Sequence, residues 1–73
     1  MKKLEGIPEY EIEVGDRFKD RRGSIYKVTK IKKGKPTYLV FQRKNREQSI
    51  TYEEIVIGFV LQNLRFNQWK FLP

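Results

Sequence analysis

The chain contains no cysteine and no histidine among its 73 residues. Disulfide bonds, thiol nucleophiles, catalytic triads that need an imidazole, and metal sites built on cysteine or histidine are therefore excluded. The longest apolar-rich run covers residues 55–61, far short of the ~20 residues of a membrane-spanning helix. The N-terminus starts with lysines but lacks the apolar stretch of a signal peptide. We therefore expect no membrane partner and, as the default for a chain without cysteine, a cytoplasmic location.

Motifs that carry enzyme chemistry are also missing. The sequence has no glycine-rich phosphate loop, no dinucleotide fingerprint and no nucleophile elbow. The adjacent acids Glu53 and Glu54 stand in an apolar context, but a helix start explains them better than general acid–base catalysis. We therefore expect a protein that is not an enzyme and that uses no cofactor and no metal.

Positive charge is concentrated in the middle of the chain. Lys and Arg number 16 against nine Asp and Glu, a formal net charge of +7. Residues 17–46 hold twelve basic residues and one acid, Asp20, whereas residues 1–16 carry a net −3 and residues 47–73 a net −1. Such segregation favours an anionic partner for the middle of the chain, although it says nothing about the fold.

Ten aromatic residues, four Tyr, five Phe and one Trp, are enough to build a small core in a chain of this length. A chain this short has room for one domain, which hides only about 60% of its unfolded surface. Gly6 and Pro8 interrupt any regular element at the start. We therefore expect a flexible arm over residues 1–9 and a single small domain over residues 10–73.

Short segments of alternating or β-branched residues predict a mainly β fold. The expected extended segments are 10–14, 17–19, 25–32, 37–43, 48–50, 59–64 and 65–72. Gly23, in the loop between the second and third segments, can take the positive φ of a tight return. In segment 25–32, Tyr26 and Val28 share one face while Ile31 falls on the other. Either both faces are partly covered, or a bulge near Thr29-Lys30 resets the register.

One short helix is expected before the last strands. Thr51 and Glu54 have the spacing of a capping box, in which each side chain bonds to the backbone N–H of the other residue. We predict a helical turn over residues 52–57 that ends at Gly58, followed by a strand over 59–64. The alternative is a helix that continues to Leu64.

Val14-Gly15-Asp16, then Phe18, a polar loop with Gly23 and an alternating strand over 25–28, resembles the opening of SH3-like and KOW-like small β-barrels. With the later Tyr52-Glu53-Glu54 turn, the pattern over residues 14–64 is also similar to short phage and prophage proteins. The resemblance implies a barrel of about five strands with a helical turn before the last strand. Such barrels bind RNA, DNA, peptides or other proteins, so the fold narrows function little.

Basic residues cluster in three expected loops, at 19–24, 30–36 and 43–47. The candidate phosphate-contacting residues are Arg21, Arg22, Lys30, Lys32, Lys33, Lys35, Arg43, Lys44 and Arg46. If a rolled sheet gathers these loops into a single rim, they form a surface for DNA or RNA. Tyr26 and Tyr38, expected to be neighbours on paired strands, either stack on bases or belong to the core. The competing interpretation is that the loop cations are simply solvated.

The C-terminal segment offers a second candidate. Phe66, Trp69 and Phe71 either close the bottom of the barrel or anchor a partner in an apolar groove. An interaction module of this kind, such as a phage-type adaptor or inhibitor, would bind an acidic protein through its basic face or another protein through these aromatics. The segment is also a possible dimer contact, so both a monomer and a homodimer are open. The acidic residues 9–13 either form an edge strand or cover the basic surface.

Overall fold

The computed structural model describes residues 2–3 and 10–72, with the side chains of 12–72. The elements follow in this order: β1 (Lys2–Lys3), β2 (Tyr10–Glu11), β3 (Arg17–Asp20), β4 (Ile25–Lys32), β5 (Tyr38–Lys44), β6 (Ile50–Val56), α1 (Ile57–Arg65) and β7 (Trp69–Leu72). The expected flexible arm over 1–9 falls mostly outside the described residues. Its described part, β1, pairs with β2 in a separate two-stranded sheet.

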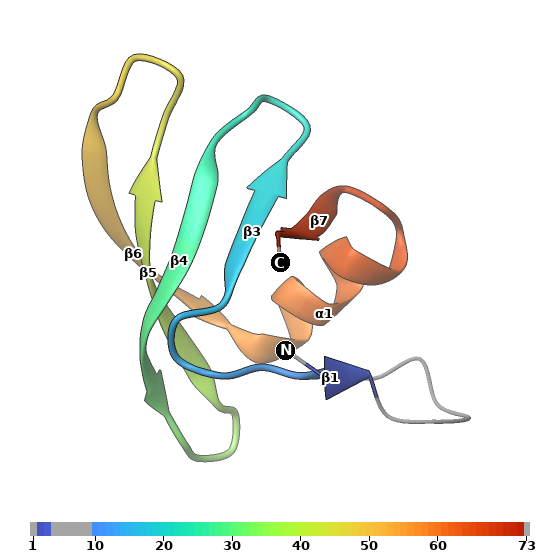
Figure 1. The fold of residues 1–73 in the computed structure, drawn as a ribbon. Coiled ribbons are helices and arrows are strands. Elements are labelled where there is room, and N and C mark those ends of the chain that lie inside the picture. Colours follow the sequence, from blue (N-terminus) through green and yellow to red (C-terminus); the bar gives the residue numbers. More distant parts are fainter. Residues whose placement is uncertain (1, 4–9, 73) are drawn as a thin grey trace.

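Strands β3 to β7 form one antiparallel sheet in the order β6-β5-β4-β3-β7. Strands β3 to β6 form a meander. The last strand, β7, returns to pair with β3, the first strand of that meander. Helix α1 contacts both β6 and β7, the two edge strands of this sheet (Figure 1). The expectation of a mainly β, small barrel-like fold with about five strands and one short helix is confirmed.

The long hairpin β4–β5 has a bulge, as one of the two alternatives predicted. Val28 faces Phe41 and Lys30 faces Val40, so the register shifts between Val28 and Lys30 and leaves Thr29 unpaired. The shift returns Ile31 to the inner face, opposite the fully buried Leu39. Because side chains alternate along a strand, one extra residue is what turns Ile31 inward. Gly23 has a φ of 94°, as expected for the tight return between β3 and β4.

The predicted helix over residues 52–57 is wrong. Residues 50–56 form β6, and the helix begins at Ile57 and ends at Arg65, so Gly58 lies inside it. The seven residues of β6 all pair with β5, and a ladder rich in β-branched and aromatic residues outweighs a capping box. Val56 is the N-cap and makes no side-chain capping bond. The prediction of a strand over 59–64 fails with it. The alternative, a helix that continues from residue 52 to Leu64, is right for residues 59–64 and wrong for its beginning.

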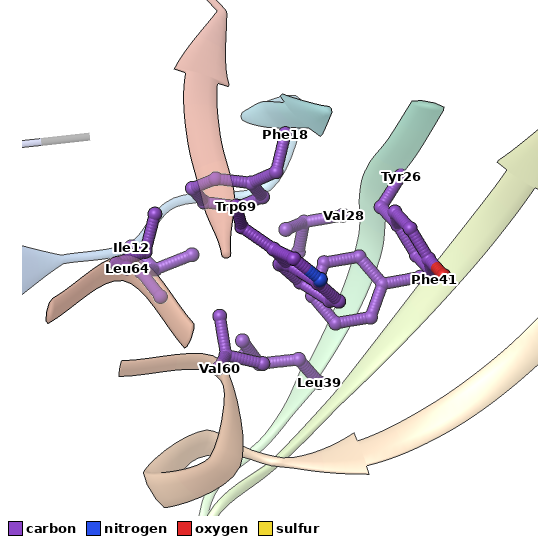
Figure 2. Packing of buried hydrophobic residues seen from close by; sticks show 9 residues of the cluster. All are labelled: Ile12, Phe18, Tyr26, Val28, Leu39, Phe41, Val60, Leu64 and Trp69. Atoms are coloured by element: carbon purple, nitrogen blue, oxygen red, sulfur yellow. The ribbon is translucent and has the colours of Figure 1, made fainter. Parts of the chain in front are cut away.

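The core lies between the inner face of the sheet and α1. Its buried apolar residues are Ile12, Phe18, Tyr26, Val28, Leu39, Phe41, Val60, Leu64 and Trp69 (Figure 2). Val60 and Leu64, one helical turn apart, are the buried positions of α1. Phe18 and Phe41 meet edge to face with ring centroids 6.2 Å apart, a favoured aromatic geometry. This packing orients the sheet, so every second residue of each strand points away from the core.

Candidate functional site

The three basic loops do not meet in a single rim. At one end of β4, Ile25 faces Lys44, so the β3–β4 loop (residues 21–24) and the β5–β6 loop (residues 45–49) lie side by side. At the other end, Lys32 faces Tyr38 and the 33–37 turn begins. Figure 1 shows the first two loops at the top and the turn at the bottom. The ends of β4 are about 23 Å apart at ~3.3 Å per residue, which separates Lys33 and Lys35 from the loop arginines.

Four of the predicted residues gather where the two neighbouring loops meet. We call this cluster the arginine end: Arg21, Arg22, Arg43 and Arg46. Its loop is ordered by Asp20, whose Oδ1 accepts the backbone N–H groups of Arg22 and Ser24, each at 2.9 Å. The side chain of Arg46 lies directly over Gly23. A Cβ atom at position 23 would stand only 3.3 Å from Arg46 Cγ. The glycine thus lets the two loops approach closely.

Arg43 differs from the other three because the fold already uses its guanidinium. The group lies 5.6 Å from the centroid of the Tyr26 ring, and Nη2 donates to Ser24 Oγ at 3.5 Å. Nε is buried without a hydrogen-bond partner and lies 3.9 Å from the carboxylate of Glu53. Arg43 therefore mainly supports the inner surface of the sheet, and Arg21, Arg22 and Arg46 are the exposed or loop-borne cations of this end.

The remaining predicted cations, Lys30, Lys32 and Lys44, lie on the outer face of the sheet. They share it with cations that the loop-based prediction missed. We call the set the cationic face: Arg17, Lys19, Lys27, Lys30, Lys32, Lys44 and Lys70. Every member is exposed, and each is at an outward position because it alternates along its strand, or pairs across strands, with residues whose side chains point to the core.

Like charges face one another across strands on this surface. Lys19 stands opposite Lys70 in the β3–β7 pair, and Arg17 stands opposite Lys27 in the β3–β4 pair. The structure describes every residue of strands β3 to β7, and in these strands Glu54 is the one carboxylate at an outward position. Its side chain forms an ion pair with Lys32 Nζ at 2.9 Å. Because directly opposed like charges destabilise a sheet, the Lys19–Lys70 pair costs stability that the fold alone does not explain.

Two exposed tyrosines accompany the cations. Tyr52 is 69% exposed and Tyr38 is 38% exposed, both at outward positions. The expectation that Tyr26 and Tyr38 are neighbours is wrong, since Tyr26 faces Arg43 and Tyr38 faces Lys32, at opposite ends of β4. Tyr26 belongs to the core. Burial raises the pKa of its hydroxyl above 10.0; the charge of Arg43 opposes the shift, and Asp20, which accepts its hydrogen bond at 3.2 Å, adds to it.

The C-terminal aromatics divide between core and surface. Trp69 is buried and stacks on Tyr26 with ring centroids 4.4 Å apart, so it closes the core. Phe71 is 38% exposed and meets Phe18 at 6.0 Å. Phe66, in the turn after α1, is 60% exposed. Of the three predicted partner anchors, Trp69 is therefore occupied by the fold, and Phe66 is the most accessible.

The described part of the chain holds no group of three or more acidic residues that is arranged to bind a metal ion. Among the same residues, no helix is long and apolar enough to cross a membrane. The surface features left to interpret are the cationic face, the arginine end and the exposed aromatic residues Tyr38, Tyr52 and Phe66.

Sequence alternation could have identified part of the cationic face. Arg17 and Lys19 flank the apolar Phe18, and Lys27 lies between Tyr26 and Val28, a pattern that predicts outward cations. Nothing in the sequence shows that β7 pairs with β3, which is what brings Lys70 beside Lys19. Comparison of the chain with protein-family models, with curated proteins and with solved structures finds no match.

Proposed function

We propose that this protein is a non-enzymatic nucleic-acid-binding domain that contacts phosphates through the cationic face and, at one edge, the arginine end. The observation that carries the proposal is the pairing of like charges across strands, with Lys19 directly opposite Lys70. A polyanion laid across the face would offset that repulsion and release its own counterions. The binding energy then comes from the same charges that weaken the free protein.

The geometry of the face favours an extended polyanion over a compact acidic patch. Outward positions repeat about every 6.7 Å along a strand and about every 4.8 Å between strands, so the cations form a two-dimensional array. Tyr38, opposite Lys32, and Tyr52, on the edge strand β6, are exposed on the same face and offer ring faces on which bases can stack. An array of cations with aromatics beside it matches the repeating phosphates and bases of a nucleic acid better than the irregular charges of a folded protein.

The resemblance to SH3-like and KOW-like barrels remains part of the proposal, as do a phage or prophage origin and a cytoplasmic location. The sheet order supports the first of these, because the last strand follows a helix and returns to the first strand of the meander. These barrels include nucleic-acid-binding and protein-binding members, so the cationic face rather than the fold carries the functional argument.

A salt titration tests the proposal directly. Fluorescence anisotropy would measure the affinity for labelled single-stranded DNA, duplex DNA and RNA of one sequence between 50 and 200 mM salt, a range over which phosphate binding weakens steeply. If about five cations meet phosphates, the slope of log affinity against log salt is about −3.5 for a single strand and about −4.5 for duplex DNA. Affinity that does not change with salt would refute phosphate contact and leave the protein-interaction alternative.

A charge-matched pair of variants locates the surface. The double variant Lys27→Glu, Lys30→Glu reverses two charges in the middle of the cationic face, and Lys33→Glu, Lys35→Glu reverses two in the turn beyond it. At 0.1 M salt each lost contact lowers single-strand affinity about fivefold. We expect a loss of about 25-fold or more for the first variant and a much smaller loss for the second. Equal losses would show that net charge, and not the cationic face, governs binding.

A further inference from the structure

An open groove lies at one corner of the cationic face, between the end of β3 and the turn that joins α1 to β7. It has a volume of about 600 Å³, and the residues that matter for its chemistry are Lys19, Arg21, Lys70, Phe66, Asn67 and Gln68. The facing pair Lys19 and Lys70 forms its edge toward the sheet. The groove thus joins the cations of the face to an exposed aromatic ring and two side-chain amides.

The turn that forms the wall of the groove is held by backbone hydrogen bonds to the end of α1. The N–H of Phe66 donates to Gln62 O at 3.0 Å and the N–H of Gln68 donates to Asn63 O at 2.8 Å. Asn67 takes a φ of 59°, a left-handed conformation that asparagine tolerates better than most residues. The backbone of the turn is therefore satisfied internally and presents its side chains without depending on a partner.

The side chains of this turn are available. Phe66 is 60% exposed, and Asn67 and Gln68 are exposed. Within residues 12–72, neither side-chain amide has a hydrogen bond to another part of the protein. Each amide can both donate and accept, which is what recognition of the edge of a base requires.

The acid in this groove does not oppose an anionic ligand strongly. Both carboxylate oxygens of Asp20 already accept hydrogen bonds, from the backbone of Arg22 and Ser24 and from the hydroxyl of Tyr26. Asp20 orders the loop that carries Arg21, while Lys19, Arg21 and Lys70 outnumber it. The local balance of charge is therefore positive, next to the exposed ring of Phe66.

We infer that this groove holds one unpaired nucleotide of the nucleic acid bound on the cationic face. Phe66 stacks on the base, Asn67 and Gln68 bond to its edge, and Lys19, Arg21 and Lys70 hold the neighbouring phosphates. The inference rests on the proposed function. The volume lies within the ~300–1,000 Å³ of typical small-ligand sites, and the three kinds of group match the three parts of a nucleotide that proteins contact in single strands.

A second depression adjoins the groove between α1 and the inner face of the sheet, where Arg22, Arg43 and Glu53 also line it. It has a volume of about 430 Å³ and shares Asp20, Arg21 and Gln68 with the first. Phe59 of α1, 52% exposed, stands on its wall. Because the bases of a duplex are stacked and paired, only single strands or unpaired ends present a base to these rings. The protein is therefore expected to prefer single strands to duplexes of the same sequence.

Two oligonucleotides with the same phosphates separate base recognition from charge. The first is a single-stranded eight-nucleotide thymidine oligomer, and the second has the same backbone with abasic sites in place of the bases. We expect the protein to bind the first at least about fivefold more tightly, the smallest effect expected for one stacked base. Phe66→Ala should reduce that preference by about fivefold or more, the share of one stacked base, while the slope of affinity against salt stays unchanged.

Three further variants guard against loss of folding and identify the interaction. Phe66→Leu keeps an apolar side chain but removes the ring, and Phe66→Tyr keeps the ring; only the second should retain the full preference for bases. Asn67→Gly preserves the left-handed backbone and deletes the amide, and should lower the affinity for the thymidine oligomer more than for the abasic one. Circular dichroism checks that each variant is folded.

The outcomes distinguish the inference from the function on which it depends. Equal, salt-dependent binding of both oligonucleotides by the folded wild-type protein would overturn the groove as a nucleotide site and leave the cationic face in place. Absence of salt-dependent binding to either would overturn the proposed function itself. An undiminished base preference in folded Phe66→Leu would also reject stacking on Phe66.

Discussion

Replacing Lys19 by glutamate is expected to raise the stability of the fold while it weakens the binding of nucleic acid. Lys19 and Lys70 are directly opposed in the β3–β7 register, and both are exposed. A cross-strand pair of opposite charge contributes ~0.2–1 kcal/mol, and a like pair destabilises. Allowing for the screening of exposed charges, the change from a like to an opposite pair should raise the free energy of unfolding by about 0.5–1 kcal/mol.

The effect on binding has the opposite sign. A phosphate contact to a single strand contributes about 0.7 to the slope of log affinity against log salt, which corresponds to about fivefold in affinity at 0.1 M salt. Reversing the charge of Lys19 should lower affinity at least fivefold and reduce the slope by about 0.7. The neutral variant Lys19→Gln should show a smaller stability gain and a smaller loss of affinity.

Urea denaturation followed by tryptophan fluorescence measures the first quantity, because Trp69 is buried in the core. A midpoint shift of about 2–8 °C in a thermal melt is the equivalent readout for a domain of this size. Lys33→Glu makes the same charge change in the turn at the far end of β4 and serves as the control. If Lys19→Glu lowers stability, or changes stability and affinity no more than Lys33→Glu does, the argument from opposed like charges is wrong.

Two further predictions concern stability alone. Gly58 lies in the first turn of α1 with a φ that is not positive, and a Cβ atom at this position would meet nothing within 4 Å. Gly58→Ala should therefore stabilise the protein by roughly 0.5–1 kcal/mol. A lower melting temperature for this variant would count against the helix bounds. The pKa of Tyr26 is raised in the folded protein, so its contribution to stability is present below pH 10 and is lost as the pH rises through the folded pKa. Tyr26→Phe should reduce the decline of the unfolding free energy between pH 9 and 11, and identical pH profiles for variant and wild type would contradict the shift.

Several features of the fold were predictable because they depend on local chemistry. The run over residues 25–32 is β-branched and aromatic, which predicts a strand. The position of Ile31 left two alternatives, coverage of both faces or a bulge, and the structure has the bulge, between Val28 and Lys30. Gly23 takes the positive φ that its loop requires. Trp69 closes the core, as one of the two interpretations of the C-terminal segment expected of a chain with few large apolar residues.

The sequence placed the helix wrongly because a helix-capping signal and a strand-forming signal overlap in residues 50–56. The interaction that decides between them is pairing with β5, which is distant in the sequence. Thr51 and Glu54 have the spacing of a capping box, yet both lie in β6, where pairing with all of β5 supplies more hydrogen bonds than one helical turn would. The burial of Val60 and Leu64 against the sheet then selects the helix at Ile57–Arg65. Amphipathic packing of this kind is what stabilises most short helices.

The sequence by itself determined that the protein is a small, mainly β, strongly basic domain without cysteine or histidine, because alternation, propensity and charge are properties of single residues and near neighbours. Only the tertiary structure decided where the cations gather. Consecutive antiparallel turns fall at opposite ends of a sheet, so the 33–37 turn lies far from Arg21 and Arg46. The return of β7 to β3 brings Lys70 opposite Lys19 and the Phe66 turn to the same corner, a juxtaposition set by long-range strand pairing.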